Sequence, residues 1–164
     1  MATEPSELKQ RFWKAIDSDR TVMLGCEGVY PRPMTAQAEN GRGPIWFFSA
    51  KGNDLVEACT RAPKTGLLML ASKNHELFAT AGGKLSVDTD PAVVERLWNP
   101  FVSAWYTGKD DPSLRLLRFD PDAAEIWNNA SSLLAGIKML IGVDPKKDYR
   151  DDMATVKLGR KTRS

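Results

Sequence analysis

Histidine and cysteine are scarce in this chain. A single histidine, His75, occurs in 164 residues, together with two cysteines, Cys26 and Cys59, which lack C-x-x-C spacing. One histidine argues against a histidine-based metal site, and we expect no metal. Two separated cysteines are more typical of free thiols than of a disulfide framework. His75 stands in "SKNHELF", where a solvated turn residue is a better interpretation than a catalyst.

The signatures of several enzyme classes are also missing. The sequence contains no G-x-S-x-G, no phosphate-binding G-x-x-x-x-G-K-[ST], no G-x-G-x-x-G and no H-E-x-x-H. These motifs mark nucleophilic hydrolases, P-loop enzymes, dinucleotide-binding folds and zinc proteases. No catalytic residue is therefore identified by motif.

Neither a charge excess nor a long apolar run is present. The chain has 23 basic and 21 acidic residues, a net charge of +2, which gives no strong electrostatic attraction to nucleic acid. No apolar run approaches the roughly 18 to 20 residues of a membrane helix, and "MATEPSELKQRF" lacks the order of a signal peptide. We expect a cytoplasmic protein with no nucleic-acid or membrane partner. A nucleic-acid binder using the basic tail "KLGRKTRS" is the alternative, which salt dependence would test.

The length and a hydrophobic content of 42% suit one domain over residues 1–164, with 1–5 and 159–164 frayed. The pattern predicts a helix capped by Ser6, short helices after Asn53 or Asp54 and after Asp90, and a helix over 131–140. Strands are predicted from residue 21 and over 31–39, 45–50, 65–73, 74–87 and 113–129, with a bulge at Gly82-Gly83. Hairpin links dominate, which favours an antiparallel barrel with peripheral helices.

The segment "YPRPMTAQAENGRGPIWFFSAKGND", residues 30–54, carries most of the chemistry. It is predicted to form two extended arms joined by "NGRG". Arg32 on the first arm is suited to a bidentate grip on phosphate. The second arm ends at residues 51–53, where a following helix presents free N–H groups to an anion. The hairpin would hold a phosphate at one end and a flat ring along its strands. Alternatively, Arg32 is a surface residue of an edge strand marked by Pro31 and Pro33.

The aromatic residues have simpler interpretations. Trp13 and Trp98 lie on helical faces and are expected in the core. Trp46 and Phe47 alternate along one strand, so one of them must point inward.

Four segments together are similar to the pyridoxamine 5′-phosphate oxidase-like flavoproteins, within them to the general stress protein subgroup. They are "RPMTAQ", "IWFFSAKGND", residues 95–129 and "GIKMLIGVDPKKDYRDD", and their order and spacing carry the resemblance over roughly residues 6 to 158. The resemblance implies a mainly β fold with peripheral helices, a six-stranded antiparallel split β-barrel of the FMN-binding type. It also implies a homodimer with FMN, or alternatively FAD, in grooves at the subunit interface.

The resemblance also implies a set of cofactor-binding residues. They come from two strands along the flavin, from the phosphate turn and from two tryptophans. The residues are Arg32, Pro33, Met34, Thr35, Gln37, Phe48, Ser49, Lys51, Asn53, Trp105 and Trp127. Gln37 is expected near the ring edge, and Trp127 is expected to come from the partner subunit. Tyr106 accompanies Trp105 as a weaker candidate.

Two departures from the family pattern limit the function. Many members have a lysine where this chain has Asp54 and Leu55, so Lys51 holds the phosphate instead or affinity is lower. The true oxidases have a lysine at the place of Gln37 and an Arg-x-His where this chain has "NNASSLL". Vitamin B6 phosphates are therefore not expected as substrates.

Two functions stay open at this point. The first is an FMN-dependent oxidoreductase, in which the protein orients the flavin and no residue needs to act as a general acid or base. The second is a non-catalytic flavin-binding module of the stress response. Turnover of NAD(P)H would separate them, and the small-molecule redox partner is not identified.

Overall fold

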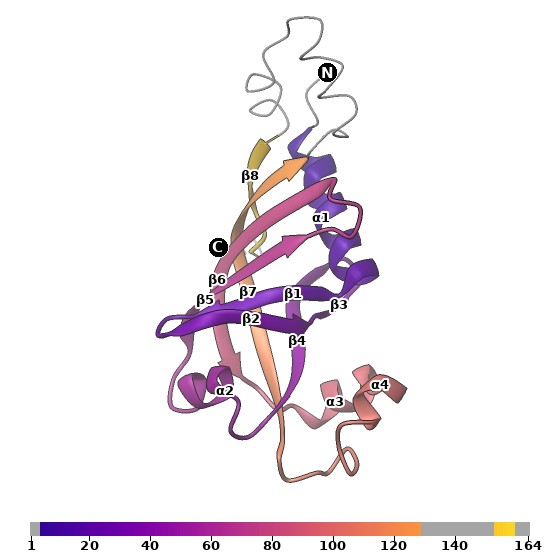
Figure 1. The fold of residues 1–164 in the computed structure, drawn as a ribbon, viewed down its shortest axis with the longest axis vertical. Coiled ribbons are helices and arrows are strands. Elements are labelled where there is room, and N and C mark those ends of the chain that lie inside the picture. Colours follow the sequence, from indigo (N-terminus) through magenta and orange to yellow (C-terminus); the bar gives the residue numbers. More distant parts are fainter. Residues whose placement is uncertain (1–3, 129–152, 160–164) are drawn as a thin grey trace, which may run out of the picture.

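The computed structural model describes residues 4–128 and 153–159 of the chain (Figure 1). Within these residues the helices are α1 (Pro5–Asp19), α2 (Asp54–Cys59), α3 (Pro91–Leu97) and α4 (Pro100–Ser103). The strands are β1 (Thr21–Cys26), β2 (Val29–Thr35), β3 (Gln37–Glu39), β4 (Arg42–Ala50), β5 (Lys64–Ala71), β6 (Leu77–Val87), β7 (Leu114–Asn128) and β8 (Met153–Lys157).

All strand pairs are antiparallel and belong to one sheet, in the order β2-β1-β5-β6-β7-β4-β3, with β8 beside β7. The sheet curls, so that β2 at one end of this order comes into contact with β4 near the other end. Figure 1 shows α1 along the upper part of the sheet and the three shorter helices around its lower part. The expected split barrel with peripheral helices is confirmed.

The described sheet has eight strands where six were expected. One extra strand arises because the predicted arm 31–39 divides at Ala36, and β8 was not foreseen. Ala36 is fully buried, and its N–H donates to the carbonyl oxygen of Arg20 at 2.6 Å. β2 therefore pairs with β1, whereas β3 pairs with β4. The expected single hairpin is wrong: Arg32 lies opposite Leu24 of β1.

Turn chemistry is predicted more accurately than pairing. Asn40 and Gly41 both have positive φ in the β3–β4 turn, at 59° and 60°. The register shifts between Gly82 and Gly83, as expected for a bulge. A Cβ on Gly83 would overlap the carbonyl oxygen of Asp120 in β7, so the bulge requires glycine there.

The helix starts agree with the sequence prediction in two of three cases. Asn53 caps α2 by accepting from the N–H of Leu55, and Asp90 caps α3. The Ser6 cap is wrong, because α1 already begins at Pro5, a residue that suits the first helical turn. Pro5 is thus helical although it was expected to fray. The predicted helix over 131–140 and residues 160–164 lie outside the described residues.

Two apolar clusters hold the fold. The main one fills the concave side of the sheet, under α1 and α2, and includes the fully buried Phe12 and Phe47. The second packs α3 on the outer side of β4 and β7 and includes Trp46. β4 thus alternates between two cores, with Phe47 in one and Trp46 in the other. Trp13 is buried as expected, whereas Trp98 is half-buried at the edge of the second cluster.

None of the helices in residues 4–128 and 153–159 is long and apolar enough to span a membrane.

Candidate functional site

A groove of about 870 Å³ has walls from β2, β4 and the α4 region. Its lining is Ser18, Asp19, Arg20, Thr21, Pro33, Met34, Thr35, Gln37, Phe48, Ser49, Ala50, Asn53, Lys73, Asn99, Phe101, Val102, Trp105 and Tyr106. This volume is within the usual range of small-molecule pockets. The groove collects eight of the eleven expected binding residues, namely Pro33, Met34, Thr35, Gln37, Phe48, Ser49, Asn53 and Trp105.

Three expected residues do not line the groove. Arg32 and Lys51 are chain neighbours of the lining residues Pro33 and Ala50, so they flank the groove at one end. Trp127 lies near the far end of β7, opposite Phe78 of β6, and is half-buried there. Its contribution through a partner subunit stays a prediction.

Two buried polar atoms at the groove have no hydrogen-bond partner among the described residues. They are Ser49 Oγ and Arg32 Nε. Ser49 is 5% exposed and lines the groove. Because buried polar groups in proteins are almost always paired, the Ser49 hydroxyl in the lining marks a place where a polar ligand would supply the missing bond.

An aromatic wall borders the groove. Phe48 packs edge-on to Trp98 with 6.1 Å between ring centroids, and Trp98 lies 6.3 Å from Tyr106. The Tyr106 hydroxyl donates to the carbonyl oxygen of Ser49 at 2.8 Å. Burial raises the pKa of this hydroxyl, and the nearby Asp111 carboxylate raises it further. The wall is therefore tied to β4, while Phe101 and Trp105 remain more than 80% exposed.

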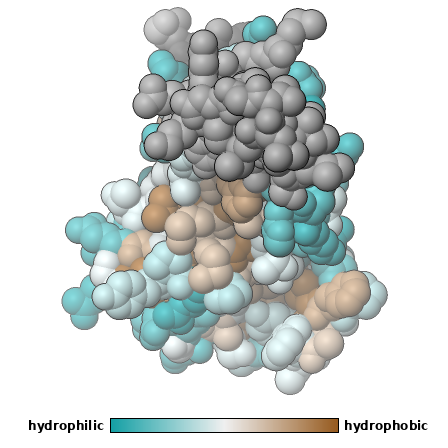
Figure 2. Space-filling model, turned by 45° about the horizontal axis from the view of Figure 1, so that its top comes forward, coloured by the Kyte–Doolittle hydropathy of each residue, from teal (hydrophilic) through white to brown (hydrophobic). Residues whose placement is uncertain are grey.

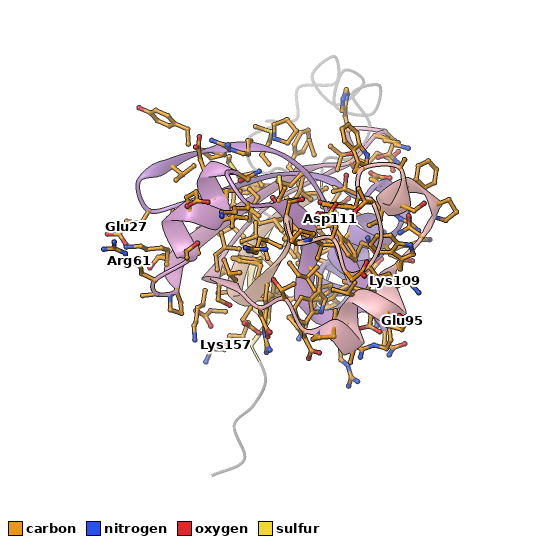
Figure 3. The ribbon with its side chains drawn as sticks, turned by 90° about the horizontal axis from the view of Figure 1, so that it is seen from below. Glu27, Arg61, Glu95, Lys109, Asp111 and Lys157 are labelled. Carbon is orange, nitrogen blue, oxygen red and sulfur yellow. The ribbon has the colours of Figure 1, made fainter. Side chains whose placement is uncertain are left out.

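The loop after α4 is held by Asp111. Its carboxylate accepts from the N–H groups of Thr107 and Ser113 and from the Ser113 hydroxyl, which lowers the Asp111 pKa to about 2. Lys109 on the same loop pairs with Glu95 of α3 at 2.9 Å (Figure 3). Lys109 is thus engaged with α3 in this chain.

Internal carboxylates occupy the end expected to bind phosphate. Arg32 Nη2 is 2.9 Å from Asp54 Oδ2, and the N–H of Gly52 donates to Glu57 Oε1 at 2.9 Å. The expectation of free N–H groups at residues 51–53 is wrong, because the N–H groups of Lys51 and Asn53 also donate, to the carbonyl oxygens of Ser113 and Ala50.

The other end of the groove was missed by sequence reasoning. Its lining comes from the α1–β1 junction and the β5–β6 turn, with Arg20 and Lys73 as its cations. Asp19 accepts from the Ser18 hydroxyl and from the backbone N–H of Lys73. The register that places Thr21 opposite Thr35 brings this junction to the groove. The sequence offered only a helix end there, because strand pairing cannot be inferred from local pattern.

Other chemistry is sparse among the described residues. No group of three or more His, Cys, Asp or Glu is placed to hold a metal. His75 is exposed in the β5–β6 turn with a φ of 58°, as expected for a turn residue. Cys26 and Cys59 are free thiols, and burial raises the pKa of Cys59 to about 11, with a further contribution from Cys26.

A second hollow of about 720 Å³ lies over β5, β6 and β7, lined by charged side chains and glycine backbone. It contains none of the expected binding residues. The groove between β2 and β4 has the aromatic wall and the unpartnered hydroxyl, and is therefore the candidate site.

Comparison with known proteins identifies the family. Residues 7–149 match the family described as "Pyridoxamine 5′-phosphate oxidase like". The chain belongs to this family. The resemblance inferred from the sequence segments is confirmed.

Two solved structures of general stress proteins are similar over nearly their whole length. A general stress family protein from Xanthomonas campestris pv. campestris is 56% identical, covering 83% of this chain and 97% of that chain, with a TM-score of 0.75. A protein from Xanthomonas citri is 55% identical, covering 81% of this chain and 96% of that chain, with a TM-score of 0.73. That protein is described as a general stress FMN/FAD binding protein.

A curated relative matches over a shorter stretch. General stress protein 26 of Bacillus subtilis (strain 168) is 24% identical over 53 residues, which are 32% of this chain. The match spans 38% of that protein's length.

Proposed function

We propose that this protein binds FMN in the groove between β2 and β4, as a flavin-dependent redox protein of the general stress group without pyridoxamine phosphate oxidase activity. The observation that carries the proposal is Ser49 Oγ, a buried hydroxyl without a partner inside a groove lined by the expected residues. The similarity to the Xanthomonas citri protein, which is described as FMN/FAD binding, supports a flavin and leaves FAD as the alternative.

The residues of the groove fit a flavin. Pro33, Met34 and Phe48 offer apolar surface for a flat ring system, while Thr35 and Gln37 bring hydroxyl and amide groups to the same wall. Arg32 would lie beside the phosphate, roughly three residues or 10 Å along β2 from Thr35, and Lys51 would approach it from the end of β4. A bound flavin supplies the electron transfer, and the protein supplies binding and orientation.

A homodimer is part of the proposal. Phe101 and Trp105 are large, exposed and adjacent to the groove, and Met23 and Leu67 are exposed on β1 and β5. Figure 2 shows apolar surface across the middle of one face between hydrophilic margins. Apolar surface of this kind favours a protein partner, and a second copy would cover the open side of the groove. Sedimentation of the flavin-loaded protein as a stable micromolar monomer would refute the dimer.

A non-catalytic flavin-binding module is the second candidate. It is supported by the absence of histidine and of an unengaged carboxylate from the described groove, since Asp19, the one carboxylate of its lining, already accepts two hydrogen bonds. Anaerobic mixing of the flavin-loaded protein with NADH and NADPH distinguishes the two. Rapid bleaching supports the oxidoreductase, and stable absorbance supports the module.

The test of flavin binding is a fluorescence titration of flavin-free protein with FMN, together with the absorbance spectrum of the protein as purified. We expect Ser49→Ala to weaken FMN about two- to tenfold, the effect of one hydrogen bond. Ser86→Ala on β6, outside the groove, is the matched control. Absence of FMN binding at tens of micromolar would overturn the proposed function.

A further inference from the structure

Charge at the phosphate end of the groove is balanced within the chain. The described groups nearest this end are Arg32 and Lys51, with one positive charge each, and Asp54 and Glu57, with one negative charge each. Arg115, opposite Ser49 on β7, and Asp111, which holds the Ser113 turn next to Lys51, add one charge of each sign. Asp54 is paired with Arg32, and Glu57 with the N–H of Gly52. A phosphate monoester brings a charge of about −1.5 to −2 at neutral pH. Such a ligand meets a site without net positive charge.

The arginine is already partly used. A bidentate grip needs two N–H groups on one edge of the guanidinium. Arg32 Nε is shut off from solvent, which leaves the two Nη atoms for a ligand, and Asp54 Oδ2 holds Nη2 at 2.9 Å. The Arg32 side chain is one-third exposed, whereas that of Asp54 is two-thirds exposed. The Asp54 side chain can therefore rotate into the solvent when another anion takes its place beside Arg32, and the ion pair is then lost.

We propose that Asp54 is a specificity-determining residue, an internal anion that competes with the ligand's phosphate for Arg32. The penalty it imposes grows with the charge beside it. It is largest for the FMN monoester, smaller for FAD, whose adjacent phosphate is a diester with a single negative charge, and absent for riboflavin. Asp54 thus makes the difference in affinity between phosphorylated flavins and riboflavin smaller than it would be without this carboxylate. This inference rests on the proposed flavin site.

A different role for Asp54 would give the opposite result. If its carboxylate served to aim Arg32 at the phosphate, removing the charge would weaken FMN. The sign of the change therefore separates competition from positioning, and the series of three flavins separates both from an effect on the fold.

The experiment compares Asp54→Asn with the parent protein by fluorescence titration with FMN, FAD and riboflavin, at fixed low ionic strength. Asparagine keeps the size of the side chain at an exposed position, so folding is not expected to change. Asp122→Asn is the matched control, because Asp122 is exposed on β7 outside the groove and its loss changes the net charge equally. We expect the Kd of FMN to fall about tenfold, that of FAD by a smaller factor, and that of riboflavin by less than twofold. The control should leave all three unchanged.

Three outcomes overturn the inference. An unchanged or weaker FMN affinity in Asp54→Asn, with riboflavin bound normally, removes the competition and leaves the flavin site standing. An equal gain for all three flavins shows an effect on the ring or the fold. Failure of the parent protein to bind any of the three removes the proposed function together with the inference.

Discussion

Tyr106 and Ser49, 57 residues apart in the chain, are joined by a hydrogen bond of 2.8 Å from the tyrosine hydroxyl to the serine carbonyl oxygen. The same serine lines the groove, and its buried hydroxyl has no partner among the described residues. The bond therefore links the aromatic wall to the strand on which the candidate ligand contact lies.

Replacing Tyr106 with phenylalanine removes this bond and keeps the ring. We expect the free energy of unfolding to fall by about 1 kcal/mol, the usual net value of a hydrogen bond, and flavin affinity to fall with it. Urea denaturation followed by tryptophan fluorescence measures the first effect. Tyr30→Phe is the control, since Tyr30 is 92% exposed and its loss should change neither quantity. Equal behaviour of the two variants would contradict a structural role for the bond.

Arg32→Ala tests the phosphate contact itself. A charge-assisted hydrogen bond is worth about 1.5 to 3 kcal/mol, so FMN affinity should drop by roughly one to two decades, while riboflavin changes little. The Asp54 carboxylate, left without its partner, adds to the loss for FMN. Isothermal titration with both ligands measures the difference. Equal losses would mean that Arg32 contacts the ring or supports the fold.

Two tryptophans should separate binding from stability. Trp13 is 6% exposed in the main core, so Trp13→Ala should lower the free energy of unfolding by about 3 to 5 kcal/mol. Trp105 is 84% exposed beside the groove, so Trp105→Ala should change stability by no more than about 0.5 kcal/mol. The Trp105 variant should instead bind flavin less tightly or dimerise less. If Trp105→Ala destabilises the monomer strongly, its side chain has a structural role.

The Cys59 thiol predicts a loss of stability in alkali. Burial raises its pKa from an ordinary value of 9.0 to about 11 in the folded chain. Below pH 9 the thiol is protonated in both states and its contribution is complete. Between pH 9 and 11 the unfolded chain ionises first, so the free energy of unfolding should fall. The free energy of unfolding, measured by denaturation at each pH across this range, should fall less steeply with pH for Cys59→Ala than for the parent. An identical pH dependence in the two proteins would refute the shift.

Vitamin B6 phosphates should not reduce the bound flavin. Gln37 is neutral, and Lys109 is engaged with Glu95, so neither offers a free cation to a second phosphate. The remaining cations of the described groove are Lys73 and Arg20, whose Nε donates to the carbonyl oxygen of Asp17, and Asp19 lies in the same lining. Anaerobic mixing with pyridoxamine and pyridoxine 5′-phosphates should leave the flavin absorbance unchanged. Rapid bleaching would place the protein with the oxidases of its family.

Local chemistry predicted the elements of this fold well. Asn40-Gly41, the caps Asn53 and Asp90, and the Gly82-Gly83 bulge depend on backbone preferences of a few residues, which a sequence shows directly. Pairing depends on distant segments. The division at Ala36 and the short β8 were missed because no nearby residue signals which strand becomes the neighbour.

The same distinction holds for the site. Eight of the expected residues line the groove. They could be predicted because the family resemblance implies which strands lie together, which the local sequence pattern does not show. Arg20 and Lys73 were missed because they come from connections that the curled sheet brings together. The ion pair of Arg32 with Asp54 was missed because both side chains look like ordinary surface residues in the sequence.

The groove lies where β2 and β4 face each other across the opening of the barrel, and this position affects how the protein can change over generations. No residue of β2 is fully buried. Substitutions of Pro33 and Thr35, which are exposed and line the groove, therefore alter what the groove recognises while leaving both cores intact, and each has a small effect on folding. During evolution, a few such substitutions could exchange one ligand for another while every intermediate variant still folds. In this fold, ligand specificity can therefore change much faster during evolution than the residues of the two cores.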